Sequence, residues 1–424
     1  MASSKGPGTA GDPTAPTPGT GRPGTSRSRR HVYKARRPRI GRSVIALVVT
    51  AALAGALVIG VQRLVKTRTS ASPPTCNATA VLSRWPLQRL ANQTIVVPAD
   101  ETSLSSIAPA ARAGYAGLLL FGARAPADLA SQLAALRRLV PGHLGWLVMT
   151  DEEGGAVQRM ANLVGSLPWA SQLGRSDSAA RIETLATSLG RKMLANGVNM
   201  DLAPVLDVDG RAVAPGAADP DGFRSFSGKS AVVAADGVAF MKGMLAAGVV
   251  PVVKHFPGLG GVSRNTDDGP AWTRPWRTLQ RFALPPFVAA IAARAPVVMM
   301  SNARVRGFTA QPASLSSKPA RYLRDNLHFK GLIITDSLSA KAISHPPKPL
   351  SVAAAAVRSL QAGDDLILYG PANSAGGALL VARQTSAAIA AAVREKALPL
   401  SQLVAADSAV LAVKKINVCA LPGA

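Results

Sequence analysis

Five residues with chemically reactive side chains stand at, or soon after, the ends of short apolar runs. They are two aspartates, two cations and a histidine: Asp151, Arg224, Lys254, His255 and Asp336. Carboxylates and imidazoles act as nucleophiles and as acid–base groups. Each residue alone also has a structural explanation, since an aspartate after a strand often caps the next helix. Because the five lie far apart in the chain, a fold that gathers them creates a candidate site.

The segments around these residues alternate between two patterns. Eight short runs are apolar or β-branched, as buried strands are: 94–98, 117–121, 146–150, 200–204, 251–255, 296–301, 332–336 and 365–369. The longer stretches between them, such as 127–139, 180–197 and 231–248, are rich in Ala and Leu at helical spacing. Repeated strand–helix units predict a parallel sheet. Eight such units favour an α/β fold of the TIM (β/α)8 barrel type over an open doubly wound sheet.

A barrel would give the reactive residues a common location. Barrel active sites lie at the carboxyl ends of the strands and in the loops that follow. Asp151 follows the third run, Lys254 and His255 end the fifth, and Asp336 ends the seventh. No glycine-rich phosphate loop follows the first run, which argues against a dinucleotide site. We therefore expect a single site on this rim.

Six sequence blocks resemble those of glycoside hydrolase family 3. They are TDEEGGAVQRM at 150–160, NMDLAPVLDV at 199–208, RSFS at 224–227, VVKHFPGLGG at 252–261, PASLSS at 312–317 and GLIITDSLSAKAI at 331–343. The blocks are most similar to those of single-barrel bacterial β-N-acetylhexosaminidases. The resemblance implies a retaining hydrolase that removes terminal β-linked N-acetylglucosamine from cell-wall-derived glycans. No residue by itself selects the 2-acetamido group, so a β-glucosidase is an alternative.

The resemblance also implies roles for individual residues. Asp336 stands at the nucleophile of the family's [ST]-D-x-L block and would form a covalent glycosyl–aspartate intermediate. The other matched positions would bind the hydroxyls of the terminal sugar: Asp151, Arg159, Arg224, Lys254 and His255. A retaining glycosidase needs one ionised carboxylate and one proton donor. The positive charges of Lys254 and Arg224 favour an ionised Asp336.

One loop departs from the family pattern. In this subgroup the fifth strand runs into KHFPGHG and then D-S-H, whose Asp and His form the acid–base dyad. Here residues 254–268 read KHFPGLGGVSRNTDD, with Leu259 in place of the first histidine. An ungapped reading puts Asp267 at the position of the dyad histidine, so we expect Asp267 to be the catalytic proton donor. Asp268 and His345 are alternatives, and a protein that binds cell-wall sugars without efficient hydrolysis is a further one.

The N-terminal region predicts export. Residues 1–43 are rich in Gly, Pro, Ser and Thr and carry ten Lys or Arg against one acid, which indicates a disordered basic cytoplasmic tail. Residues 44–61 form an uncharged apolar run of 18, long enough for a transmembrane helix or signal anchor. A linker at 62–84 and the barrel at 85–419 follow. This order predicts a single-pass cell-membrane protein with an extracellular catalytic domain, or a secreted one if the segment is cleaved.

Cysteine and charge usage complete the predictions. Cys76 and Cys419, the only cysteines, bracket the expected barrel, so a disulfide joining its ends is favoured over two free thiols. The formal net charge is +25, which allows binding to anionic cell-wall polymers. Aromatic residues make up only 4% of the chain and no nucleic-acid motif is present. We expect a small carbohydrate substrate, no nucleic acid, no cofactor and no metal.

Overall fold

The computed structural model describes residues 76–345, 349–371 and 374–421. The predicted tail at 1–43, the predicted membrane segment at 44–61 and most of the predicted linker lie outside the described residues. Residues Ala78–Leu82 at the end of that linker form helix α2, and Leu82 is fully buried. The domain that the structure describes therefore begins at the cysteine that precedes this helix.

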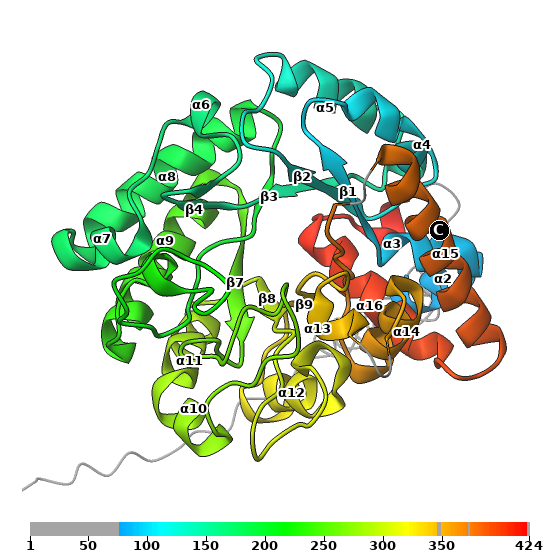
Figure 1. Cartoon of the computed structure of the whole chain (residues 1–424). Helices are drawn as coiled ribbons and strands as arrows, with labels where there is room; N and C mark the ends of the chain where they lie inside the picture. The colour runs from blue at the N-terminus through cyan, green and yellow to red at the C-terminus, as the bar shows by residue number, and fades with distance from the viewer. Residues whose placement is uncertain (1–75, 346–348, 372–373, 422–424) are drawn as a thin grey trace, which may run out of the picture. The chain divides into compact units, whose positions relative to one another are not determined.

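The core element of the domain is a curled sheet of seven parallel strands (Figure 1). In spatial order the strands are β1 (Val96–Asp100), β2 (Gly117–Phe121), β3 (Leu147–Thr150), β6 (Met200–Asp201), β7 (Val250–Phe256), β8 (Val297–Met300) and β9 (Leu332–Thr335). Spatial order follows chain order, as expected for repeated strand–helix units. A separate antiparallel pair, β4 (Glu152–Gly154) and β5 (Val157–Gln158), follows β3.

Side chains alternate between two buried layers along these strands. In β2, Leu119 points to a core enclosed by the sheet, whereas Leu118 packs in the layer between the sheet and the helices. Other strands also contribute to the enclosed core: Val96 of β1, Met149 of β3, Val252 of β7, Val297 of β8 and Ile334 of β9. Because both faces are covered, the strands read as nearly continuous apolar runs. This is the origin of the runs recognised in the sequence.

Helices surround the outer face of the sheet (Figure 1). They are α3 (Leu87–Gln93), α4 (Ala108–Arg112), α5 (Leu129–Arg137), α6 (Ala161–Val164), α7 (Ala170–Ser176), α8 (Ala179–Ala195), α9 (Ser230–Ala247), α10 (Trp276–Phe282), α11 (Leu284–Ala292), α12 (Ser317–Arg321), α13 (Lys341–Ser344), α14 (Val352–Ala362), α15 (Ala375–Arg394) and α16 (Leu400–Val413). In α8, the Ser178 side chain caps the N-terminus, and the buried residues Ile182, Ala186, Leu189 and Met193 recur at helical spacing. Gly243 of α9 lets that helix approach the backbone of α8 closely. The predicted helical stretches thus form the outer layer.

The eighth predicted strand, 365–369, is not a strand of this sheet. Isolated parallel bridges, Ile95 to Ile367 and Ile334 to Leu366, connect it to both edges of the sheet. Some backbone amides here bond to side chains where a regular ladder would pair them with carbonyl groups. The Asp365 carboxylate accepts from the Ile333 amide at 2.8 Å, and the Leu368 amide donates to the Thr335 hydroxyl at 2.9 Å. Because these contacts interrupt a regular ladder, the segment bridges the two edges without forming a full strand.

Cys76 and Cys419 form a disulfide, as predicted. Their Cα atoms lie 5.9 Å apart although 343 positions separate them in the chain. The bond joins the segment before α2 to the short 3-10 helix Val418–Ala420. It therefore ties together the two ends of the domain.

Two of the described helices, α9 and α15, are long and apolar enough to span a membrane. In each, 44% of the apolar window is buried within the domain. Helix α9 packs on α8, α11 and β7, and α15 packs on α14, α3 and β1. Their apolar character is accounted for by packing around the sheet.

Candidate active site

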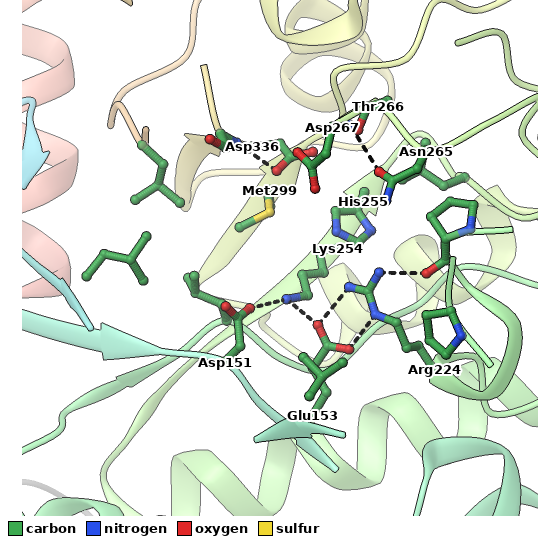
Figure 2. A pocket seen from close by; sticks show the side chains of 18 of the residues that line it. Asp151, Glu153, Arg224, Lys254, His255, Asn265, Thr266, Asp267, Met299 and Asp336 are labelled. Carbon is green, nitrogen blue, oxygen red and sulfur yellow. Dashed lines mark hydrogen bonds and ion pairs between the residues drawn. The ribbon is translucent and has the colours of Figure 1, made fainter. Parts of the chain in front are cut away.

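A cavity of about 310 Å³ opens at the carboxyl ends of the strands (Figure 2). Its walls contain every residue that the sequence assigns to the site: Asp151, Arg159, Arg224, Lys254, His255, Asp267 and Asp336. Apolar side chains, among them Phe121 and Met299, line other parts of the wall. The fold therefore brings together residues from the ends of several strands, as the barrel prediction requires.

Four charged side chains form a connected network on one wall (Figure 2). The Lys254 Nζ lies 2.8 Å from Asp151 Oδ1 and 2.6 Å from Glu153 Oε1. Arg224 binds Glu153 with two hydrogen bonds, of 2.7 Å from Nε and 2.8 Å from Nη2. Such a two-bond contact fixes the plane of the guanidinium as well as its position. The network presents a rigid surface of alternating charge to the cavity.

Burial and neighbouring charges shift the pKa values of Glu153 and Lys254 in opposite directions. Burial alone would raise the pKa of Glu153, but the charges of Arg224 and Lys254 outweigh it and hold that pKa well below its ordinary value. Burial alone would lower the pKa of Lys254, but Asp151 and Glu153 raise it above its ordinary value. Glu153 and Lys254 are therefore charged at neutral pH.

A tight hairpin places Glu153 in the network. Strands β4 and β5 pair across Gly154 and Gly155, which have φ angles of 105° and 57° that favour glycine. The preceding residue, Glu152, points into the wall and accepts from the Arg159 and Met160 amides, each at 2.7 Å. Alternation along the strand then turns Glu153 to the cavity side. Burial raises the pKa of Glu152 to about 7.

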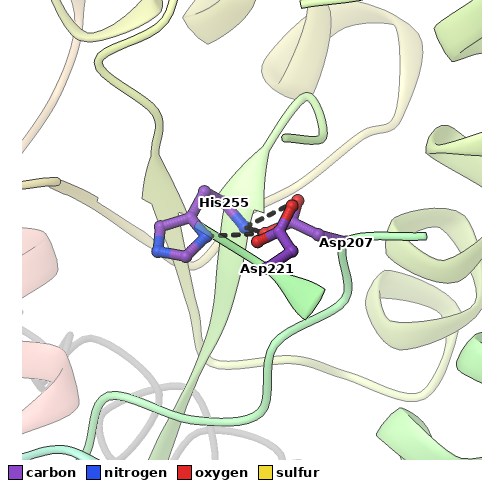
Figure 3. Close-up of side chains that lie close together, drawn as sticks. All are labelled: Asp207, Asp221 and His255. Atoms are coloured by element: carbon purple, nitrogen blue, oxygen red, sulfur yellow. Dashed lines mark hydrogen bonds and ion pairs between the residues drawn. The ribbon is translucent and has the colours of Figure 1, made fainter. Parts of the chain in front are cut away.

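His255 is held from behind by a buried aspartate (Figure 3). Its Nδ1 lies 2.7 Å from Asp207 Oδ2, and the other Asp207 oxygen accepts from the Leu259 amide at 2.6 Å. A carboxylate at this distance favours the proton on Nδ1. The ring, which lines the cavity, is thereby fixed in orientation.

Asp336 follows β9 directly and is held by backbone contacts. Its amide donates to the Met300 carbonyl at 2.8 Å, and its Oδ1 accepts from the Ser337 amide at 2.7 Å. These bonds fix the carboxylate in the lining of the cavity, directly after the end of the strand. A fixed carboxylate with one oxygen free of these contacts is suited to nucleophilic attack.

Asp267 lies in the loop after β7 and reaches the same part of the cavity as Asp336 (Figure 2). The loop is anchored on α13, because the Ala342 amide donates to the Thr266 carbonyl at 2.9 Å, and on the loop after β6, because the Asn265 amide donates to the Ala217 carbonyl at 2.8 Å. The carboxyl remains accessible to water from the cavity mouth. Desolvation by the walls, followed by the charge of Asp336, raises the pKa of Asp267 to about 6. Two carboxyl groups with different surroundings thus face one cavity.

Of the other residues expected at the site, Arg159 lines the cavity and the two alternative proton donors do not. Arg159 lines the cavity, with Nη2 at 3.9 Å from Asp151 Oδ2. Asp267 and the two alternative proton donors, Asp268 and His345, are all exposed, but of these three only Asp267 lines the cavity. Within the described residues of the loop after β7, Asp267 is therefore the carboxyl group placed at the site.

The sequence gives no sign of the roles of two residues: Glu153 was not predicted, and Asp207 was expected near the rim but without a function. Glu153 stands inside the block TDEEGGAVQRM, and its place before two glycines was a usable sign of a hairpin. Asp207 ends the block NMDLAPVLDV, but its partner His255 lies 48 residues away, a separation that no local pattern reveals.

Comparisons with known proteins identify the family of the chain. Residues 115–413 match the glycosyl hydrolase family 3 N terminal domain. Beta-hexosaminidase LpqI of Mycobacterium tuberculosis is 35% identical over 269 residues, which cover 60% of this chain and 66% of that protein. A beta-hexosaminidase of Xylella fastidiosa strain 9a5c is 34% identical, over 60% of this chain and 75% of its own length. The chain thus spans just under two thirds of the length of LpqI.

Solved structures agree as well. The beta-N-acetylhexosaminidase of Beutenbergia cavernae superposes with a TM-score of 0.69 at 30% identity, covering 79% of this chain and 100% of the other. The chain belongs to glycosyl hydrolase family 3. This confirms the resemblance recognised in the sequence blocks.

Proposed function

We propose that the protein is an exported retaining glycoside hydrolase that removes terminal β-linked N-acetylglucosamine from cell-wall-derived glycans. The observation that carries the proposal is the pair Asp336 and Asp267, two carboxyl groups in one cavity whose surroundings separate their roles. The names of the similar proteins, beta-hexosaminidase and beta-N-acetylhexosaminidase, support the choice of sugar. We interpret the domain as a (β/α)8 barrel in which segment 365–369 takes the place of the eighth strand.

Asp336 is the nucleophile in this proposal. It attacks the anomeric carbon, the bond to the leaving oxygen breaks, and a glycosyl–aspartate forms. The Ser337 amide, which donates to Oδ1, holds the carboxylate in place during attack. The charged network of Asp151, Glu153 and Lys254 binds the hydroxyls of the terminal sugar and keeps the ring oriented above the nucleophile.

Asp267 is the acid–base group. As a carboxylic acid it protonates the leaving oxygen, and as the resulting carboxylate it then accepts a proton from the water that hydrolyses the intermediate. A pKa raised to about 6 suits both steps, because each protonation state is accessible near neutral pH. In this proposal Asp267 carries out the acid–base catalysis that an Asp–His dyad performs in the subgroup that the sequence resembles.

The cellular location is part of the proposal. The apolar run 44–61, with Lys and Arg before it, supports a membrane anchor with the domain outside. The disulfide between Cys76 and Cys419 supports the same side, because disulfides persist in oxidising compartments. Anionic wall polymers are proposed as a further contact of this basic chain.

The test compares two N-acetylglucosaminides, one with a good leaving group and one with a poor one. We expect turnover of both by the full-length chain in detergent. Matching β-glucosides measure sugar choice, and preference for them would replace N-acetylglucosamine by glucose in the proposal. Binding of N-acetylglucosamine without turnover of either substrate would favour the second candidate, a sugar-binding protein.

A further inference from the structure

A second cluster of reactive groups lies behind the wall of the cavity (Figure 3). It consists of Asp207 and Asp221, both from the loop after β6, and His255 of β7. One donor atom from each residue lies within 4.8 Å of the others. Asp207 and Asp221 are fully buried, and His255 is 6% exposed. None of the proposed catalytic carboxyl groups belongs to this cluster.

The Asp221 side chain has no hydrogen-bond partner among the described residues. Both of its carboxyl oxygens are buried without one, although buried polar atoms in proteins are nearly always paired. The nearby cation, Arg224, is already engaged by the two Glu153 oxygens and by the Pro220 carbonyl at 2.8 Å. Asp221 therefore has two carboxyl oxygens without a partner, and one of them lies within 4.8 Å of donor atoms of His255 and Asp207.

Asp207 and Asp221 place two carboxyl groups close together in a buried space. Asp207 is partnered by His255 Nδ1 and by the Leu259 amide, which offset one carboxylate. A second buried carboxylate beside it adds like charge in a region of low dielectric, and such an arrangement is costly without a compensating positive charge. A cation with oxygen and nitrogen ligands would supply that charge.

We propose that Asp207, Asp221 and His255 bind a divalent transition-metal ion such as Zn²⁺ or Mn²⁺. Two carboxylates and an imidazole are a ligand set that these ions accept. Binding releases the Nδ1 proton of His255 to solvent, and the ring nitrogen then coordinates the ion. The cavity gives access, because His255, Arg224 and Pro220 line it.

The spacing of the three donor atoms indicates which side chain moves when an ion binds. Donors around a tetrahedral zinc ion lie about 3.4 Å apart when each bond is about 2.1 Å. The 4.8 Å span is wider than this, and Asp221 is the member free to move inward because nothing holds its oxygens. No metal is expected from the sequence, and the buried, unpartnered carboxyl group of Asp221 changes this expectation.

The experiment measures metal content and not glycosidase turnover, so its outcome is independent of the proposed function. The full-length chain in detergent, carrying no polyhistidine tag, is stripped with a chelator and dialysed against Zn²⁺ or Mn²⁺. Elemental analysis should find one ion per chain. Loading with Co²⁺ should give the intense visible absorption bands of a nitrogen- and oxygen-ligated ion, a signature that surface adsorption lacks.

Asp221→Asn should weaken binding at least about tenfold, since even loss of an outer-shell partner costs about 10- to 100-fold in affinity. Asp209→Asn is the matched control: Asp209 lies in the same loop but pairs with Arg211 at 3.2 Å and is not a member of the cluster. It should bind as the parent does. Absence of an ion in the parent, or equal binding by Asp221→Asn, would overturn the proposal. Absence of an ion in the parent overturns the proposal even if a variant fails to fold.

Discussion

Replacing Asp267 by asparagine removes the proposed proton donor while keeping the size of the side chain. The donor matters only when the leaving group needs a proton, and general acid catalysis is typically worth about 10² to 10⁴ in rate. We therefore expect kcat/KM for a poor leaving group to fall by at least about 10²-fold, a barrier increase of about 2.7 kcal/mol. The loss for a good leaving group should stay below about tenfold.

The pH dependence of the cleavage rate is a second test of the role of Asp267. Burial and Asp336 raise the pKa of Asp267 to about 6, so the group is protonated below that value and becomes ionised above it. Cleavage of poor leaving groups in the parent should therefore decline as pH rises through about 6. In the Asp267→Asn variant this decline should be absent, because no titrating donor remains.

The control is Asp268→Asn, which removes an exposed neighbour that does not line the cavity. It should retain parental rates on both substrates. Equal loss on good and poor leaving groups in Asp267→Asn would refute the reasoning, because it would show that Asp267 positions the loop or the sugar and delivers no proton.

Four other perturbations extend the test. Asp336→Asn should abolish turnover of every substrate while leaving the unfolding transition in place, and a rate within about tenfold of the parent would exclude it as nucleophile. Glu153→Gln should lower the free energy of unfolding by about 3 kcal/mol, because it leaves two buried cations without their carboxylate. Since the pKa of Glu153 lies below its unfolded value, its contribution is present above about pH 4 and lost as pH falls further, so the variant should show a flatter acid limb in urea titrations. Cys419→Ser should cost about 2 to 5 kcal/mol in the same titrations, and the reduced parent should match it. Protease added outside intact cells should digest the chain after residue 61 and spare the tail, whereas protection of the whole domain would reverse the predicted orientation.

The sequence predicted the sheet because its strands are buried on both faces. The run at 117–121 coincides with β2, and the run at 332–336 differs from β9 by one residue. The run at 365–369 has the same apolar character, but Asp365 and Thr335 use their side chains to bond backbone groups of the neighbouring segment. Such long-range substitutions for ladder bonds leave no trace in a local pattern.

The candidate site was predictable where chemistry coincides with a strand end. Lys254 and Asp336 could be located because the end of a barrel strand is where a catalytic group belongs. Asp221 could not, since its importance comes from burial beside Asp207 without a partner. Those are properties of tertiary packing, and the residue lies in a loop with no periodic pattern.

The central claim is tested most directly by mass spectrometry of the covalent intermediate. The Asp267→Asn variant, supplied with an N-acetylglucosaminide that has a good leaving group, should accumulate glycosyl-enzyme because water attack lacks its base. The account predicts a sugar adduct on the peptide that contains Asp336. Release of N-acetylglucosamine with no adduct on that peptide, or with an adduct on a different carboxylate, would contradict it.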